Sequence, residues 1–285
     1  MKVLQCLFEP RTTEQWRQYF RHNAEHLRPI PWSLGVSFTS DELKAVTNSI
    51  REFQLGESSE GKHLIAQGKQ YAQSSGDAFY SETLGLFIAE EHRHARDLGR
   101  VLDLAGIERA GHAWPDAIFR WLRHRAGLEV SIAVLVTAEI IAQVYYPALR
   151  EATTSPVLRA LCDQIIFDEL SHVHFQCERL AILRRRRQRV SLAVRHATGQ
   201  ILFAGAIVVV WIQHGRVFRA GGCSVKRCWR DCWLRFNDAA KRMNPRLYSW
   251  PAKGAETSAD MAADVAGAAV GQSPATAVKL DITFP

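Results

Sequence analysis

The sequence predicts an all-α protein, and three observations support that prediction. Apolar residues recur at helical spacing over long stretches, which is the pattern of amphipathic helices. Glycine and proline are scarce, with 18 and 10 among 285 residues, so turns are few. No stretch alternates apolar and polar residues as a half-buried strand does. We therefore expect long helices joined by short connections.

Composition indicates a globular protein, with 47% apolar and 23% charged residues. The six cysteines show no framework of secreted disulfides, and the N-terminus lacks the apolar stretch of a signal peptide. We expect reduced thiols and a cytoplasmic location, with association at a membrane surface left open.

Residues 1–38 are expected to form an N-terminal arm with one short helix. Thr12 and Gln15 have the spacing of a capping box, in which each side chain bonds the other's backbone. Trp16, Tyr19 and Phe20 follow at helical spacing. A Pro-Ile-Pro sequence then ends the helix.

Residues 39–190 are expected to form a four-helix bundle. Thr39 and Glu42 repeat the capping-box spacing, and Gly106 has the position of a helix-ending glycine. A serine followed by Pro156 starts another helix, and Pro147 is expected to kink or end the one before it. The four predicted helices span about 41–73, 78–105, 128–150 and 156–187, with a short helix near 116–125.

Residues 191–250 are expected to form a basic and aromatic extension of at least two helices, and 251–285 a flexible tail. Residues 184–247 hold 15 Lys and Arg against 2 Asp and Glu, a formal charge of +13. An anionic partner fits this charge, and an acidic carrier protein, RNA or a membrane surface remain alternatives, as does a solvated basic face. The apolar run 201–212 is shorter than the roughly 20 residues needed to cross a bilayer.

The chemistry-bearing pattern is Glu-x-x-His, which places a carboxylate and an imidazole one turn apart on one helix face. It occurs three times, at Glu60/His63, Glu91/His94 and Glu169/His172. The second and third pairs continue the apolar stripes of their helices. Glu139 likewise lies among apolar residues of its own helix. An unpaired buried carboxylate costs several kcal/mol, so these inward acids predict cations.

The order of these groups along the chain is Glu, Glu-x-x-His, Glu, Glu-x-x-His. In this order, over about residues 41–187, the sequence resembles the ferritin-like carboxylate-bridged di-iron proteins, which use one Glu from each of two helices and Glu-x-x-His from each of the other two. The resemblance implies a ferritin-like four-helix bundle with an N-terminal helix and a C-terminal helical extension. It implies six metal ligands: Glu60, Glu91, His94, Glu139, Glu169 and His172.

For several residues near these ligands, more than one role is possible on the sequence. Glu57 also fits the apolar stripe of the first bundle helix and is the alternative to Glu60; the choice of Glu60 rests on its spacing, which mirrors the second half. Glu90 and Asp168 directly precede the two ligand pairs and are candidates for orienting the imidazoles. Tyr146 is a candidate catalytic residue, with a purely structural core tyrosine as the alternative.

The resemblance implies two iron ions, with manganese or a mixed pair as alternatives, because carboxylate oxygens suit these hard metals. It implies a non-haem di-iron oxidoreductase that uses O2 to oxidise an organic substrate, with electrons from a partner protein. The alternatives are a ferroxidase or peroxide-scavenging protein of ferritin or rubrerythrin type, and a metal-free helical interaction module. The substrate, the electron donor and a homodimeric state are left open.

Overall fold

The computed structural model describes residues 6–58, 61–111 and 127–250, and these residues form an all-helical fold, as predicted. The long helices are α1 Thr13–Glu25, α2 Ser40–Ser58, α3 Lys62–Ser75, α4 Tyr80–Leu104, α6 Leu128–Glu151, α7 Pro156–Arg184, α8 Arg189–Ala220 and α9 Val225–Arg242. Two short 3-10 turns are η1 Trp32–Leu34 and η2 Pro245–Leu247. The predicted helix at 116–125 and the predicted tail at 251–285 lie outside these residues.

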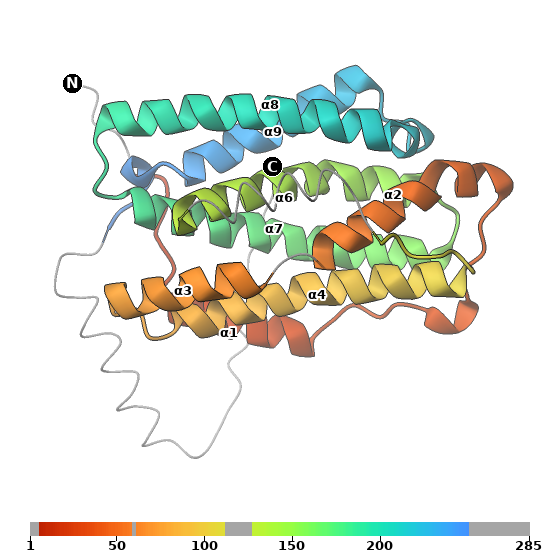
Figure 1. Cartoon of the computed structure of the whole chain (residues 1–285), viewed down its shortest axis with the longest axis horizontal. Coiled ribbons are helices and arrows are strands. Elements are labelled where there is room, and N and C mark those ends of the chain that lie inside the picture. The colour runs from red at the N-terminus through yellow and green to blue at the C-terminus, as the bar shows by residue number, and fades with distance from the viewer. Residues whose placement is uncertain (1–5, 59–60, 112–126, 251–285) are drawn as a thin grey trace, which may run out of the picture. The chain divides into compact units, whose positions relative to one another are not determined.

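The helices pack in layers around the α6–α7 pair, whose four-residue connection makes it a helical hairpin. Helix α4 contacts α7 on one side, and α1, α2 and α3 all pack on α4. On the other side, α8 lies against α6, and α9 lies against α6 and α7 (Figure 1). The interior between α4, α6 and α7 is filled by apolar side chains such as Phe87, Leu98, Ile132 and Ile165.

Local signals place most helix ends where the sequence predicts them. Thr12 and Gln15 form the expected reciprocal capping box, and Thr39 and Glu42 form the second one. Gly106 has a φ of 67°, which glycine adopts without strain, and terminates α4. Helix α6 continues past its internal proline to Glu151.

The predicted single helix over 41–73 is wrong, because the structure divides it into α2 and α3. Gly61 has a φ of 146°, a conformation that other residues rarely adopt and that no α-helix contains. The local sequence explains the break, since two glycines and two serines occur between 56 and 61 and all four are weak helix formers. Helix α2 therefore ends at Ser58.

The two ends of this helical unit meet. The backbone amides of Leu7 and Phe8 donate to the carbonyl of Leu247 at 2.8 and 3.0 Å, and Phe8 and Tyr248 form an isolated parallel bridge. Their rings lie 5.3 Å apart. The N-terminal arm is thus fastened to the segment that follows α9.

Among the described residues, two helices are long and apolar enough to cross a membrane by length and composition alone, namely α6 and α8. In α6, 72% of the most apolar stretch is buried inside the protein, as expected of a core helix. In α8 the corresponding share is 39%. The apolar character of α6 is accounted for by the core, whereas that of α8 is not.

Candidate metal centre

Four helices bring carboxylate and imidazole groups to one buried place. The contributors are Glu57 from α2, Glu91 and His94 from α4, Glu139 from α6, and Glu169 and His172 from α7. Their ligand-type atoms form two sets, each with all atoms within 4.8 Å of one another: Glu57, Glu91, His94 and Glu169, and Glu91, Glu139, Glu169 and His172. Glu91 and Glu169 belong to both sets. The cluster therefore offers two adjacent ion positions that share two carboxylates.

Helix register explains this convergence. Residues three apart lie on one helix face, so Glu91 and His94 point together from α4, and Glu169 and His172 point together from α7. Because α4 packs against α7, these faces meet. His172 Nδ1 lies 2.7 Å from Glu91 Oε1 and 3.8 Å from Glu139 Oε2.

The outer nitrogen of each histidine is held by a second acid. His94 Nε2 lies 2.9 Å from Asp168 Oδ2, and His172 Nε2 lies 2.9 Å from Glu90 Oε2. In a neutral ring whose Nε2 donates to a carboxylate, the lone pair is on Nδ1, which faces the cluster. The roles predicted for Asp168 and Glu90 match this geometry.

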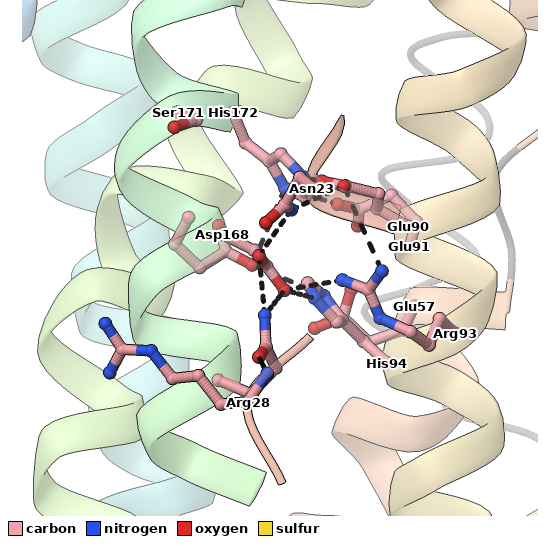
Figure 2. A network of polar contacts seen from close by, with 12 residues as sticks. Asn23, Arg28, Glu57, Glu90, Glu91, Arg93, His94, Asp168, Ser171 and His172 are labelled. Atoms are coloured by element: carbon pink, nitrogen blue, oxygen red, sulfur yellow. Dashed lines mark hydrogen bonds and ion pairs between the residues drawn. The ribbon is translucent and has the colours of Figure 1, made fainter. Parts of the chain in front are cut away.

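A further layer of donors surrounds these two acids (Figure 2). Asn23 of α1 donates to Glu90 at 2.6 Å and to Asp168 at 2.9 Å, so it links the two histidine-holding acids. Arg93 Nη2 donates to Asp168 Oδ2 at 2.6 Å. Gln164, one turn before Asp168 on α7, donates to both of its oxygens.

The atoms at the centre of the cluster differ, because they are buried and lack hydrogen-bond partners. They are Glu91 Oε1, both carboxylate oxygens of Glu169, His94 Nδ1 and His172 Nδ1. Buried polar atoms are nearly always paired in folded proteins, and leaving one unpaired costs about 1–3 kcal/mol. Glu91 Oε1 and His172 Nδ1 lie 2.7 Å apart, and all five atoms belong to residues of the two ligand sets, where metal ions would satisfy them. The donor set therefore fits metal ions.

The pKa shifts of the clustered groups also favour cations at this place. Burial, together with the charge of Glu139, raises the pKa of Glu91 and of Glu169 well above the usual range. Burial alone would lower the pKa of His172, but the charge of Glu91 and the hydrogen bond to Glu90 raise it well above its usual value. Burial disfavours the charge of Asp168, yet its bond to His94 and the charge of Arg93 lower its pKa. Without cations, protons have to offset the charge of the inner carboxylates.

Glu57, the alternative first-helix ligand in the sequence prediction, lies at the cluster. Its side chain belongs to one of the two ligand sets and accepts a 2.6 Å hydrogen bond from Tyr146 Oη. Glu60, the preferred residue in that prediction, lies outside the described residues.

Tyr146 is fully buried and contacts the cluster through Glu57. Its phenol donates to that carboxylate, and burial raises the pKa of Tyr146 well above its usual value. The tyrosine thus orients Glu57 as a neutral donor.

Sequence reasoning missed Asn23, Arg93 and the glutamines around the centre. Gln176 could have been predicted from its position, because it lies one turn after His172 on α7. It donates to Glu139 Oε1 at 3.0 Å. Asn23 carries no such signal, because only the docking of α1 on α4 brings it to the site.

Comparisons of this chain with known protein families, with curated proteins and with solved structures found no match. What the protein does is therefore inferred from the chemistry of the cluster itself.

Proposed function

We propose that this chain is a ferritin-like dinuclear metal protein, with the ions held by Glu57, Glu91, His94, Glu139, Glu169 and His172. The observation that carries the proposal is the convergence of buried ligand atoms on Glu91, Glu169 and the two histidines, which have no hydrogen bonds of normal geometry. The pairing of one glutamate with one Glu-x-x-His in each half, and the two shared carboxylates, support the same arrangement.

Iron is the proposed metal, with manganese or a mixed pair as the alternative. Four carboxylates and two neutral imidazoles balance two divalent ions, and oxygen-rich sites favour iron or manganese over softer metals. None of the cysteines described in the structure belongs to either ligand set. This composition argues against a structural zinc site, which usually contains thiolates.

The proposed reaction is the oxidation of an organic substrate with O2, as a non-haem di-iron oxidoreductase. Two ferrous ions, when bound, supply the electrons that reduce dioxygen. The chain's own residues keep bulk water out, since Phe87 packs at 4.8 Å from the ring of His172 and Phe20 at 6.2 Å. Asp168 and Glu90 hold the imidazoles in one tautomer, and Tyr146 orients Glu57. An electron-donor partner re-reduces the centre in this proposal.

Metal analysis tests the centre. Protein produced with iron should contain about two metal ions per chain, as the two ligand sets require. Because Glu169 belongs to both sets and Glu139 to one, Glu169→Ala should lose both ions while Glu139→Ala retains about one. The measurement is metal content by mass spectrometry on gel-filtered protein.

The matched control is Glu178→Gln. This glutamate is also buried on α7, but it accepts a hydrogen bond from Trp16 and belongs to neither ligand set. It should leave the metal content unchanged. Equal metal content in all three variants would refute the ligand assignment.

Oxygen consumption separates the proposed oxidation from iron handling. Uptake of O2 that depends on an organic substrate and a reductant supports the oxidoreductase. Ferrous oxidation that continues with neither identifies a ferroxidase or peroxide-scavenging protein instead. A chain that binds no metal under any condition is a helical interaction module.

A further inference from the structure

Helix α8 carries an apolar stripe on its outward face. Seven outward positions recur at intervals of three or four residues and are exposed: Val190, Val194, Ala197, Ile201, Gly205, Val208 and Ile212. Ile201 is 76% exposed and Ile212 is 75% exposed. From first to last the stripe runs about 33 Å at the helical rise of 1.5 Å per residue. We call these seven residues the α8 stripe.

The opposite face of the same helix is already used by the fold. Phe203, Ile207 and Phe218 point inward and are buried, and α8 packs on α6 and α2. Helix α8 is therefore apolar on both faces over most of its length. Such helices are normally covered all round, and contiguous apolar surface on a soluble protein marks a site of association.

Basic residues border the stripe at both ends. No Asp, Glu, Lys or Arg occurs between Arg195 and Arg216. Five arginines cluster over 184–189 before the stripe, and Arg216 and Arg219 follow it. Glu129 pairs with Arg184, Arg187 and Arg195, which leaves one carboxylate among three guanidinium groups. The border is thus strongly positive.

Helix α9 also exposes large apolar side chains beside basic ones. It follows α8 after a four-residue turn and exposes Trp229 and Leu234 next to Lys226, Arg227 and Arg230. Tryptophan beside basic residues is typical of surfaces that sit at the boundary between lipid headgroups and acyl chains.

We propose that the α8 stripe docks on an anionic lipid bilayer, with α8 parallel to the membrane surface. The stripe enters the boundary of headgroups and acyl chains, and the basic residues at its ends and on α9 contact lipid phosphates. A span across the bilayer does not fit, because the other face of α8 is packed against α6 and α2.

Charge distinguishes a bilayer from a second copy of this chain. Residues 184–247 carry a formal charge of +13, so two copies joined through this face would bring two such segments together. Repulsion opposes that contact, whereas an anionic surface is attracted to each copy. The proposal concerns a surface separate from the metal centre and does not depend on it.

Vesicle flotation with the full-length protein tests the proposal. The chain should bind vesicles of phosphatidylcholine with about one-third phosphatidylglycerol, bind phosphatidylcholine alone at least tenfold more weakly, and lose most binding in high salt. Absence of binding to the anionic vesicles would overturn the proposal.

Two variants separate apolar from electrostatic contributions. Ile201→Glu with Ile212→Glu should lower the partition coefficient about a hundredfold, since two large apolar side chains leave the bilayer. Arg216→Gln with Arg219→Gln should lower it about tenfold or more on anionic vesicles. Both pairs are exposed, so circular dichroism and the thermal midpoint should match those of the wild type.

The matched control is Leu34→Glu with Leu104→Glu, which replaces two exposed leucines outside α8 and α9. It should bind as the wild type does. Equal binding by the Ile201/Ile212 variant would overturn the proposal. So would a wild-type dimer in sedimentation velocity that the same variant dissociates, because the stripe would then join two copies. Binding of RNA in preference to vesicles, lost in the arginine variant alone, would also overturn it.

Discussion

Asp168 is a buried residue whose single carboxylate holds several other side chains in place. It has no exposed surface and accepts hydrogen bonds from His94, Arg93, Asn23 and Gln164. One carboxylate thus fixes an imidazole, neutralises a buried guanidinium and connects α1 to α7. Its role is to keep His94 Nδ1 directed at the centre.

Replacing Asp168 with asparagine should weaken both stability and metal binding. The amide cannot neutralise Arg93, and loss of one partner from a buried ion pair costs about 3–5 kcal/mol. Loss of the acceptor behind His94 should lower metal affinity about 10–100-fold. Urea unfolding and competition titration with a chelating dye measure the two effects.

Asp163→Asn is the control on the same helix. Its carboxylate pairs with Arg150 at the surface and is 40% exposed, so the change should cost less than about 1 kcal/mol and leave metal affinity unchanged. If Asp168→Asn behaves like this control, the positioning role is wrong.

At the scale of elements, two glycines lie at or near the break between α2 and α3 and differ in backbone conformation. Gly56 lies inside α2 and Gly61 forms the break with its positive φ. Gly56→Ala should stabilise the fold by about 0.5–1 kcal/mol, because alanine favours helix and a methyl group there meets nothing within 4 Å.

Gly61→Ala should have the opposite sign. A methyl group at Gly61 makes only ordinary contacts with His92 and Ile88, so the cost is backbone strain of about 1–3 kcal/mol. The free energies of unfolding of the two variants, measured side by side, check this difference. A stabilised Gly61→Ala would show that the helix prefers to continue through this point.

The sequence predicts the elements well where local chemistry decides them. Capping boxes, Gly106 and Pro156 mark helix ends because they act within a few residues. The break at Gly61 is missed because the apolar stripe continues across it. Hydrophobic periodicity takes no account of the low helix propensity of glycine. The position of Asn23 is missed because tertiary packing of α1 determines it.

The inner residues of the candidate centre can be predicted from the sequence, because their helical phase places them on the buried faces of their helices. Glu91, Glu139 and Glu169 stand in apolar stripes, where a carboxylate needs a partner. Glu57 and Glu60 both fit the stripe, so phase alone leaves that choice open.

At the scale of the whole molecule, the proposed metal centre predicts that metal binding depends on pH. The pKa values of Glu91, Glu169 and His172 are raised well above their usual range, which favours the protonated forms in the metal-free protein. Metal ions bind the deprotonated groups and displace these protons, so affinity should rise with pH and fall as the solution is acidified. We expect about one to three protons released per chain.

Calorimetry with Mn²⁺ in two buffers of different ionisation enthalpy counts these protons. The apparent binding enthalpy should differ between the buffers in proportion to the protons released. Identical enthalpies would show that the inner acids are already ionised without metal, against the pKa shifts that burial causes.

The contact between the N-terminal arm and the segment after α9 joins residues about 240 positions apart in the chain. Phe8 is translated well before Tyr248, so this contact forms only after the helices between them, α1 to α9 of the described residues, have been made. The proposed metal ligands of α7 are translated well before that moment, so the described ligand set is synthesised in full before the two ends join.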